Sequence, residues 1–259
     1  MPRGGTRRRN GHPRPPRGPR SRSRRDLRGR GRVLAPGRLY AGSSGFSYSS
    51  WKGDFYPADA RPEDFLRLYS LRLPSVELNS TFYRLPAEEQ FERWAEQTPP
   101  GFRFAVTLAR RLTSFGRVEG MNAAAQAIGR LGERLGPVRI KVAQARDDGF
   151  LRLLLDSLDP EMDWALDFRH PSWFAPEIEA RVDSKQVARV GALEGGARFR
   201  YLRLREPPYD DATLAETATR IQPLLAEGLD VYLYFQHEDE PTAPRYAERL
   251  LELVSDLRA

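Results

Sequence analysis

Short apolar stretches of strand length alternate with longer amphipathic stretches of helix length from residue 39 onward. The expected strands cover 39–43, 75–79, 102–107, 138–142, 164–168, 186–190, 199–204 and 231–235. The expected helices cover 61–73, 87–97, 122–135, 147–158, 176–182, 211–226 and 241–257. Regular β–α alternation indicates a parallel sheet, because parallel strands need a crossover connection, usually a helix. Eight strands predict an α/β fold of the (β/α)₈ TIM-like barrel type, and a doubly wound open sheet is the alternative.

The sixth repeat is the weakest part of this pattern. The strand expected at 186–190 is poor, and the connection that follows it is short and rich in glycine. We therefore expect a shortened or irregular sixth β–α unit within a single barrel domain that covers 38–259.

The charge of the chain is divided unevenly between a basic tail and an acidic body. Residues 1–38 hold 14 of the 42 basic residues and one of the 35 acidic ones, so the remainder has 28 basic against 34 acidic residues, a charge of −6. Residues 1–37 consist mainly of Arg, Gly, Pro and Ser, a composition that cannot bury enough apolar surface to offset its ordering entropy. We expect a disordered Arg-rich tail there. It is either an arm for nucleic acid or an anionic surface, or a solvated extension without a partner.

Several classes of protein are excluded by what the sequence lacks. It contains no cysteine, which excludes disulfides and cysteine-ligated metals. No apolar run approaches the roughly 20 residues that span a bilayer, and the N-terminus has no apolar core of a secretory signal. We expect a cytoplasmic protein without a membrane partner. Its oligomeric state is left open.

Polar residues alternate with apolar ones near the ends of several expected strands. Val76 and Leu78 alternate with Glu77 and Asn79, a period of two that places the polar pair on one face. In a TIM-type barrel one face of each strand points inward, and chemistry is placed at the C-terminal ends of the strands. The polar positions expected to face inward are Glu77, Asn79, Asp167, Arg169, Tyr201, Arg203, Arg205, Tyr234 and Gln236. The residues expected at or just past strand ends are Thr107, Gln144, His170, Trp173, Tyr209, His237 and Glu238.

This set of side chains has two interpretations. Planar guanidinium groups suit phosphate or carboxylate, so the arginines indicate a site for an anionic or sugar-like small molecule. The alternative is a structural network inside the barrel, with Glu77 paired to Arg169 or Arg203. Loop aromatics could form a wall for such a ligand or pack against the body. The spacing of acidic and histidine residues carries no metal signature, so no metal site is predicted and no cofactor is identified.

Several longer motifs resemble one family. They are Gly42-Ser-Ser-Gly-Phe-Ser-Tyr48, Val76-Glu-Leu-Asn-Ser-Thr-Phe-Tyr-Arg84, Asp167-Phe-Arg-His-Pro-Ser-Trp173, Tyr201-Leu-Arg-Leu-Arg205 and Tyr232-Leu-Tyr-Phe-Gln-His-Glu238. On these residues the chain is identified as a member of the DUF72 (YecE-like) family of uncharacterised TIM-barrel proteins. The resemblance implies a (β/α)₈ barrel with a pocket but no named reaction. It also implies a lysine at the end of the third strand, where this chain has Thr107, and often a histidine where it has Ser114.

The sequence thus leads to two hypotheses about function. In the first the chain is an enzyme, a hydrolase or lyase, that acts on an anionic or sugar-like small molecule at the C-terminal mouth of the barrel. Its expected catalytic residues are Glu77 as general acid or base, with Arg169 and Arg203 holding the substrate. Its expected ligand-binding residues are Asn79, Tyr83, Gln144, Asp167, His170, Trp173, Arg205, Tyr209 and His237. In the second the chain is a non-catalytic protein on a barrel scaffold that binds a ligand, or nucleic acid through the Arg-rich tail only.

Overall fold

The computed structural model describes Met1 and residues 35–112, 118–236 and 240–257. The basic tail predicted at 1–37 therefore lies almost wholly outside the described residues. Ser114, His237 and Glu238 also lie outside them.

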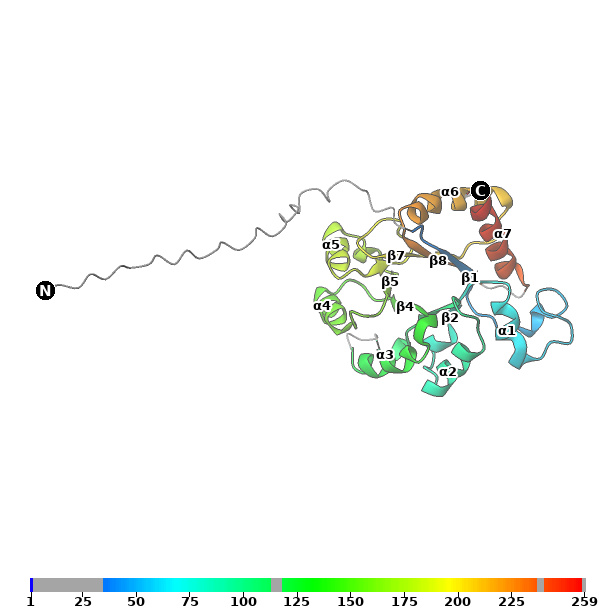
Figure 1. The fold of residues 1–259 in the computed structure, drawn as a ribbon, viewed down its shortest axis with the longest axis horizontal. Coiled ribbons are helices and arrows are strands. Elements are labelled where there is room, and N and C mark those ends of the chain that lie inside the picture. The colour runs from blue at the N-terminus through cyan, green and yellow to red at the C-terminus, as the bar shows by residue number, and fades with distance from the viewer. Residues whose placement is uncertain (2–34, 113–117, 237–239, 258–259) are drawn as a thin grey trace. The chain divides into compact units, whose positions relative to one another are not determined.

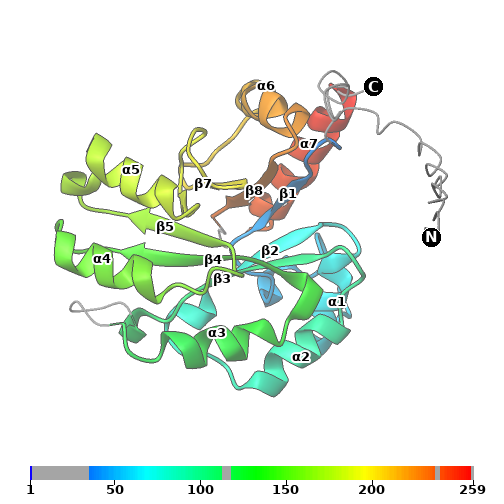
Figure 2. The same ribbon diagram turned by 60° about the vertical axis from the view of Figure 1, so that its left-hand side comes forward.

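The described strands are all parallel and form two sheets (Figures 1 and 2). One sheet has the order β1-β8-β7, with β1 at Leu39–Ser43, β8 at Asp230–Phe235 and β7 at Phe199–Leu204. The other runs in chain order through β2 at Ser75–Leu78, β3 at Arg103–Thr107, β4 at Leu135–Val142, β5 at Trp164–Phe168 and β6 at Ala188–Arg189.

The two sheets meet at both of their edges. A parallel bridge between Ser44 and Glu77 joins the end of β1 to β2. At the other seam the amide of Gly191, just after β6, donates a hydrogen bond of 2.8 Å to the carbonyl oxygen of Tyr201 in β7. The eight strands thus follow one another in chain order around a (β/α)₈ TIM-like barrel, which confirms the predicted fold class.

Seven α-helices within the described residues pack around this barrel (Figure 1). They are α1 at Phe65–Ser70, α2 at Glu88–Glu96, α3 at Met121–Gly129, α4 at Asp148–Ser157, α5 at Pro176–Ser184, α6 at Asp211–Ala226 and α7 at Thr242–Asp256. Two of them begin at an aspartate whose carboxylate accepts a backbone N–H of the first turn, Asp147 for α4 and Asp210 for α6. No helix among the described residues is both long enough and apolar enough to cross a membrane.

The two faces of the strands bury different kinds of side chain. The apolar positions, such as Val76, Leu166 and Leu233, are fully buried against the surrounding helices. The barrel interior holds aromatic rings packed on alanines, and Tyr40 stacks on Tyr232 with 4.7 Å between ring centroids. These rings fill the N-terminal part of the interior. The charged network described below lies at the other end of the interior, at the C-terminal ends of the strands.

The sixth unit is irregular, as predicted: a loop held by Arg200 connects β6 to β7 where a helix would be expected. Residues 190–198 are all described and form no helix between β6 and β7. The buried guanidinium of Arg200 donates to four backbone carbonyls, those of Leu193, Gly195, Ala197 and Phe199, at 2.7–2.9 Å. It thereby satisfies loop carbonyls that a helix would otherwise pair internally.

The predicted boundary between α3 and β4 is wrong. The helix expected at 122–135 ends at Gly129, and β4 begins at Leu135 with Gly136 and Pro137 inside the strand. A Cβ at Gly136 would lie 3.1 Å from a ring carbon of Tyr232 and 3.2 Å from the carbonyl oxygen of Phe104. The glycine therefore lets β4 pass close to the barrel interior.

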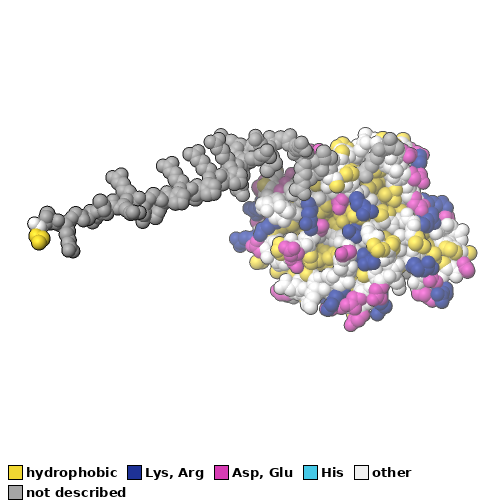
Figure 3. Space-filling model, viewed as in Figure 1, with side chains coloured by type: hydrophobic (Ala, Val, Ile, Leu, Met, Phe, Trp, Pro, Cys, Tyr) yellow, Lys and Arg dark blue, Asp and Glu magenta, His cyan; other side chains and the backbone are white. Residues whose placement is uncertain are grey.

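Basic and acidic side chains are interspersed on the face of the body that Figure 3 shows. The surface of the body also has ion pairs, such as Arg130 with Glu88 at 2.7 Å and Arg146 with Glu177 at 2.7 Å. Such pairs contribute little to stability, because solvent screens them. The buried ion pairs of the molecule lie instead at the C-terminal ends of the barrel strands.

Candidate functional site

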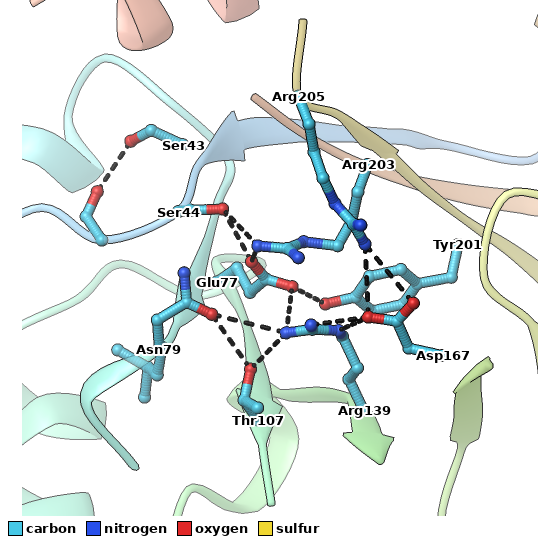
Figure 4. A network of polar contacts seen from close by, with 12 residues as sticks. Ser43, Ser44, Glu77, Asn79, Thr107, Arg139, Asp167, Tyr201, Arg203 and Arg205 are labelled. Carbon is cyan, nitrogen blue, oxygen red and sulfur yellow. Dashed lines mark hydrogen bonds and ion pairs between the residues drawn. The ribbon is translucent and has the colours of Figure 1, made fainter. Parts of the chain in front are cut away.

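Glu77, at the end of β2, is the buried centre of a polar network (Figure 4). Its side chain has no solvent exposure. One carboxylate oxygen, Oε2, accepts the hydroxyl of Ser44 at 2.7 Å and lies 2.8 Å from Nη2 of Arg203. The other, Oε1, accepts the hydroxyl of Tyr201 at 2.7 Å and lies 3.4 Å from Nη1 of Arg139. Both oxygens are thus engaged from strands on different sides of the barrel.

Arg139, from β4, connects Glu77 to a second carboxylate. Its Nη2 and Nε donate to Oδ2 of Asp167 at 2.6 and 2.9 Å. Its Nη1 also donates to the hydroxyl of Thr107 at 3.0 Å and lies 3.5 Å from the side-chain oxygen of Asn79. The side chain of Arg139 is only 4 % exposed, so its guanidinium lies buried beneath the more accessible side chains at the C-terminal ends of the strands.

Asp167, at the end of β5, holds two further arginines that are more accessible. Nε of Arg169 lies 3.2 Å from Oδ1, and Nη2 of Arg205 lies 3.2 Å from Oδ2. The side chain of Asp167 is 5 % exposed, whereas those of Arg205 and Arg169 are 26 % and 32 % exposed. The arginines therefore cover the carboxylate and present their own surface to solvent.

The network fixes the charge states of Glu77 and Tyr201. Burial alone would raise the pKa of the Glu77 carboxyl, but Arg139 and Arg203 outweigh burial and bring its pKa below the ordinary value. The hydrogen bonds from Ser44 and Tyr201 act in the same direction. Burial, with the nearby charge of Glu77, raises the pKa of Tyr201 well above its ordinary value. At neutral pH Glu77 is a carboxylate and Tyr201 a protonated hydroxyl.

Positive charge exceeds negative charge in this network. Two carboxylates, Glu77 and Asp167, face the guanidiniums of Arg139, Arg169, Arg203 and Arg205, which leaves a formal charge of +2. Nε of Arg203 and Nε of Arg205 are buried without a hydrogen-bond partner among the described residues. An excess of guanidinium with unused donors is an arrangement that binds anions.

Most residues predicted on the inner faces of the strands do meet in this network. Glu77, Asn79, Asp167, Arg169, Arg203 and Arg205 all belong to it. The predicted pairing of Glu77 with Arg203 is present, whereas Arg169 pairs with Asp167. Thr107, which stands where the family resemblance implies a lysine, accepts a hydrogen bond from Arg139.

Predicted site residues on loops have partners outside this network. Trp173 is fully buried, stacks on Phe168 and donates to the backbone carbonyl of Gln144 at 2.7 Å. Nδ1 of His170 accepts the backbone amide of Ser172 in a local turn. The predicted loop positions thus include side chains that hold the loops in place.

Two further loop aromatics differ in their exposure. The hydroxyl of Tyr209 accepts the amide of Glu206, and its ring packs on Phe235. Tyr83 is 85 % exposed and has its ring against Phe82.

Four members of the network, Ser44, Thr107, Arg139 and Tyr201, were not among the predicted catalytic or ligand-binding residues, and two of them, Arg139 and Ser44, were also not expected on inner faces or at strand ends. Arg139 alternates with Val138 and Ile140 in β4, so the period of two that located Glu77 also marks Arg139 as inward-facing. Ser44 lies one residue past β1, and no sequence pattern distinguishes its hydroxyl from those of its neighbours. Among the described residues, no three His, Cys, Asp or Glu side chains are grouped so that they could hold a metal ion.

Comparisons with known proteins support the fold and the family. The family model "Protein of unknown function DUF72" matches residues 40–259. The chain is similar to UPF0759 protein YunF of Bacillus subtilis, with 24 % identity over 53 % of each chain. It is also similar to UPF0759 protein YecE of Escherichia coli K12, with 28 % identity over 49 % of each. The chain thus spans about half the length of the curated relatives it matches.

Solved structures extend the fold comparison to most of the chain. A DUF72 family protein of Enterococcus faecalis superposes with a TM-score of 0.70 at 15 % identity, over 85 % of this chain and 99 % of that one. A DUF72 family protein of Thermotoga maritima gives 0.67 at 22 % identity, with the same coverage. At these identities the likeness concerns the fold alone.

Proposed function

Because this chain belongs to the DUF72 family and has a TIM-like barrel, we propose that it binds an anionic small molecule at the barrel mouth and acts on it as a hydrolase or lyase. One observation carries this proposal: four guanidiniums surround two carboxylates at the C-terminal ends of the strands. A phosphate or carboxylate group of a ligand would balance that charge and use the unpaired donors.

The arginines have distinct roles in this proposal. Arg205 and Arg169 are the accessible pair, and they make the first contacts with the anion. Arg203 lies deeper, with its side chain 8 % exposed, and contributes a buried Nε that has no partner among the described residues. Arg139 holds the two carboxylates in place from below.

Glu77 and Asp167 act as positioning residues in this arrangement. Each fixes guanidiniums whose planes would otherwise adopt several orientations. Glu77 is wholly buried and its pKa is lowered by the arginines against the effect of burial, so it holds no proton to donate at neutral pH. The energetic contribution to the reaction is then the stabilisation of developing negative charge by preorganised guanidiniums.

A second candidate function is ligand binding without chemistry. It is favoured by the pairing of both carboxylates in the network, which leaves neither Glu77 nor Asp167 free to act as a general base. In that case the guanidiniums would serve affinity and selectivity only.

A panel of phosphate monoesters, phosphodiesters and hydroxy acids, each incubated with the protein and followed by NMR, separates the two functions. The same compounds are titrated calorimetrically. Turnover that is lost in Arg203→Lys supports the enzyme, because lysine keeps the charge but not the planar fork. If at least one compound binds and none is turned over, the second function is supported. If no anion binds, both functions are refuted.

A further inference from the structure

A groove beside the arginine network provides a second contact surface for the ligand. We propose that it binds the uncharged, hydroxyl-bearing part of a ligand whose anionic group rests on the arginines, so that the substrate class is a sugar phosphate or sugar acid. This inference rests on the proposed anion site and adds to it a subsite of different chemistry.

The groove has a volume of about 680 Å³ and is formed by segments distant in sequence. Its walls come from the loop after β1, the turn before α1, the end of β2 and one face of α2. Small-molecule sites usually have volumes of roughly 300–1,000 Å³. The groove is therefore large enough for a monosaccharide-sized group.

The lining of the groove suits hydroxyl groups better than charges. Its hydrogen-bonding side chains are mostly neutral amides and hydroxyls, namely Ser47, Tyr48, Asn79, Ser80, Gln90 and Gln97. Of its two charged residues, Arg93 donates to the amide oxygen of Gln90 at 2.7 Å, and Glu63 pairs with Arg61 at 3.2 Å. Neutral amides can donate to and accept from the same sugar hydroxyls, which a charged group cannot do.

Aromatic side chains supply the apolar surface that a sugar ring requires. Phe46 and Trp94 line the groove and are half-buried. Trp94 is supported from behind by Phe104, with 6.3 Å between stacked ring centroids, and by the edge of Phe91. A rigid aromatic surface next to amides offers a ligand both apolar contact and directed hydrogen bonds.

Asn79 links the groove to the arginine network. It lines the groove, and its side-chain oxygen accepts from Thr107 at 3.1 Å and lies 3.5 Å from Nη1 of Arg139. On the opposite wall, the Tyr48 hydroxyl donates to the carbonyl oxygen of Ser44, which binds Glu77 through its own hydroxyl. The groove and the arginine network thus share Asn79 at the end of β2, and the proposed ligand extends from one to the other past this residue.

The loop after β1, which forms one wall of the groove at residues 45–48, has a tightly determined conformation. Gly45 has φ of +102°, in the region that favours glycine. A Cβ at this position would lie 2.4 Å from the hydroxyl oxygen of Tyr48. The loop therefore brings Tyr48 close to the backbone between Ser44 and the groove, which preorganises this side of the subsite.

The test compares glucose 6-phosphate, gluconate, glucose and inorganic phosphate by calorimetry. The wild type is compared with the double variant Gln90→Ala, Gln97→Ala, and with Gln126→Ala on α3 as a control outside the groove. Alanine favours helix, so these variants retain α2 and α3. We expect glucose 6-phosphate or gluconate to bind at least roughly tenfold more tightly than phosphate, given two or more added hydrogen bonds. The double variant should lose most of that gain, whereas its phosphate affinity and the control should stay unchanged.

The outcomes separate the subsite from the anion site. If phosphate binds and neither sugar compound binds more tightly, the groove proposal is refuted and the anion site stands. The same holds if the double variant keeps the full gain. If phosphate, glucose 6-phosphate and gluconate all fail to bind, both proposals are refuted. A preference for glucose 6-phosphate over gluconate, or the reverse, identifies which anion the arginines take.

Discussion

Replacing Glu77 with glutamine should destabilise the barrel strongly. The substitution keeps the size of the side chain but removes the charge that faces Arg203 at 2.8 Å and Arg139 at 3.4 Å. Glu77 is fully buried, and removing one partner from a buried ion pair costs roughly 3–5 kcal/mol because the remaining charge is left uncompensated. For a domain of this size, each kcal/mol corresponds to roughly 2–4 °C in Tm. We therefore expect Glu77→Gln to lower Tm by about 10 °C.

Urea denaturation and thermal melts at neutral pH measure this loss. The matched control is Glu252→Gln, because Glu252 forms an exposed pair with Arg249 on α7 and its loss should change stability little. The acid dependence gives a second readout. Since the folded-state pKa of Glu77 is lowered, its stabilisation is complete above the unfolded-state pKa and is lost as pH falls through the folded value. Glu77→Gln should therefore show a shallower loss of stability below about pH 4.

A double-mutant cycle with Arg203→Met locates the effect in the ion pair. In the Arg203→Met background one of the guanidiniums that faces Glu77 is gone, so Glu77→Gln leaves less uncompensated charge there. The summed losses of stability in the two single variants should therefore clearly exceed the loss in the double variant. Equal stability of Glu77→Gln and Glu252→Gln, or strict additivity in the cycle, would falsify the assignment of Glu77 as the buried charge partner of the arginines.

Three other changes test separate parts of the structure. Arg200→Ala removes four hydrogen bonds to backbone carbonyls in and next to the loop before β7 and should cost about 3 kcal/mol in urea denaturation while phosphate affinity is unchanged; a neutral result would mean that the irregular sixth unit is held by other contacts. Trp173→Phe keeps the stack on Phe168 but loses the hydrogen bond to Gln144, so stability should fall by about 1 kcal/mol and ligand affinity should hold; a large loss of affinity would return Trp173 to the ligand site. Deleting 1–37 removes 13 arginines and one aspartate and should weaken RNA binding and flatten its dependence on salt; unchanged binding would show that the tail is no nucleic-acid arm.

The fold was readable from the sequence because its signals are local and repeated. The strands β1, β5 and β7 have the predicted bounds, since each is a short apolar run of limited length. The boundary between α3 and β4 was not readable in the same way. Gly136 and Pro137 resemble a turn, and only the proximity of Tyr232 and Phe104 explains why a glycine lies within the strand.

The candidate site was predictable where its residues lie on strands, because the alternation of polar and apolar side chains shows which face of a strand they occupy. The period of two placed Glu77, Asp167 and Arg203 on inner faces, and the structure brings them into one network. The same period marks Arg139, but this residue lies in the middle of β4, away from the strand end where site residues were predicted. Loop residues such as Trp173 follow no such rule. Their positions depend on tertiary packing, which no periodicity describes.

Whether the arginine network binds an anion is tested most directly by calorimetric titration of inorganic phosphate into the wild type, Arg205→Ala and Arg198→Ala. Arg205 is the accessible arginine held by Asp167, whereas Arg198 forms an exposed pair with Asp163 just before β7, away from the strands' C-terminal ends. We predict saturable binding to the wild type and to Arg198→Ala, and a loss of at least roughly tenfold in affinity for Arg205→Ala, as expected for a charge-assisted contact. Equal affinity of all three proteins, or no binding by the wild type, would contradict an anion site at the barrel mouth.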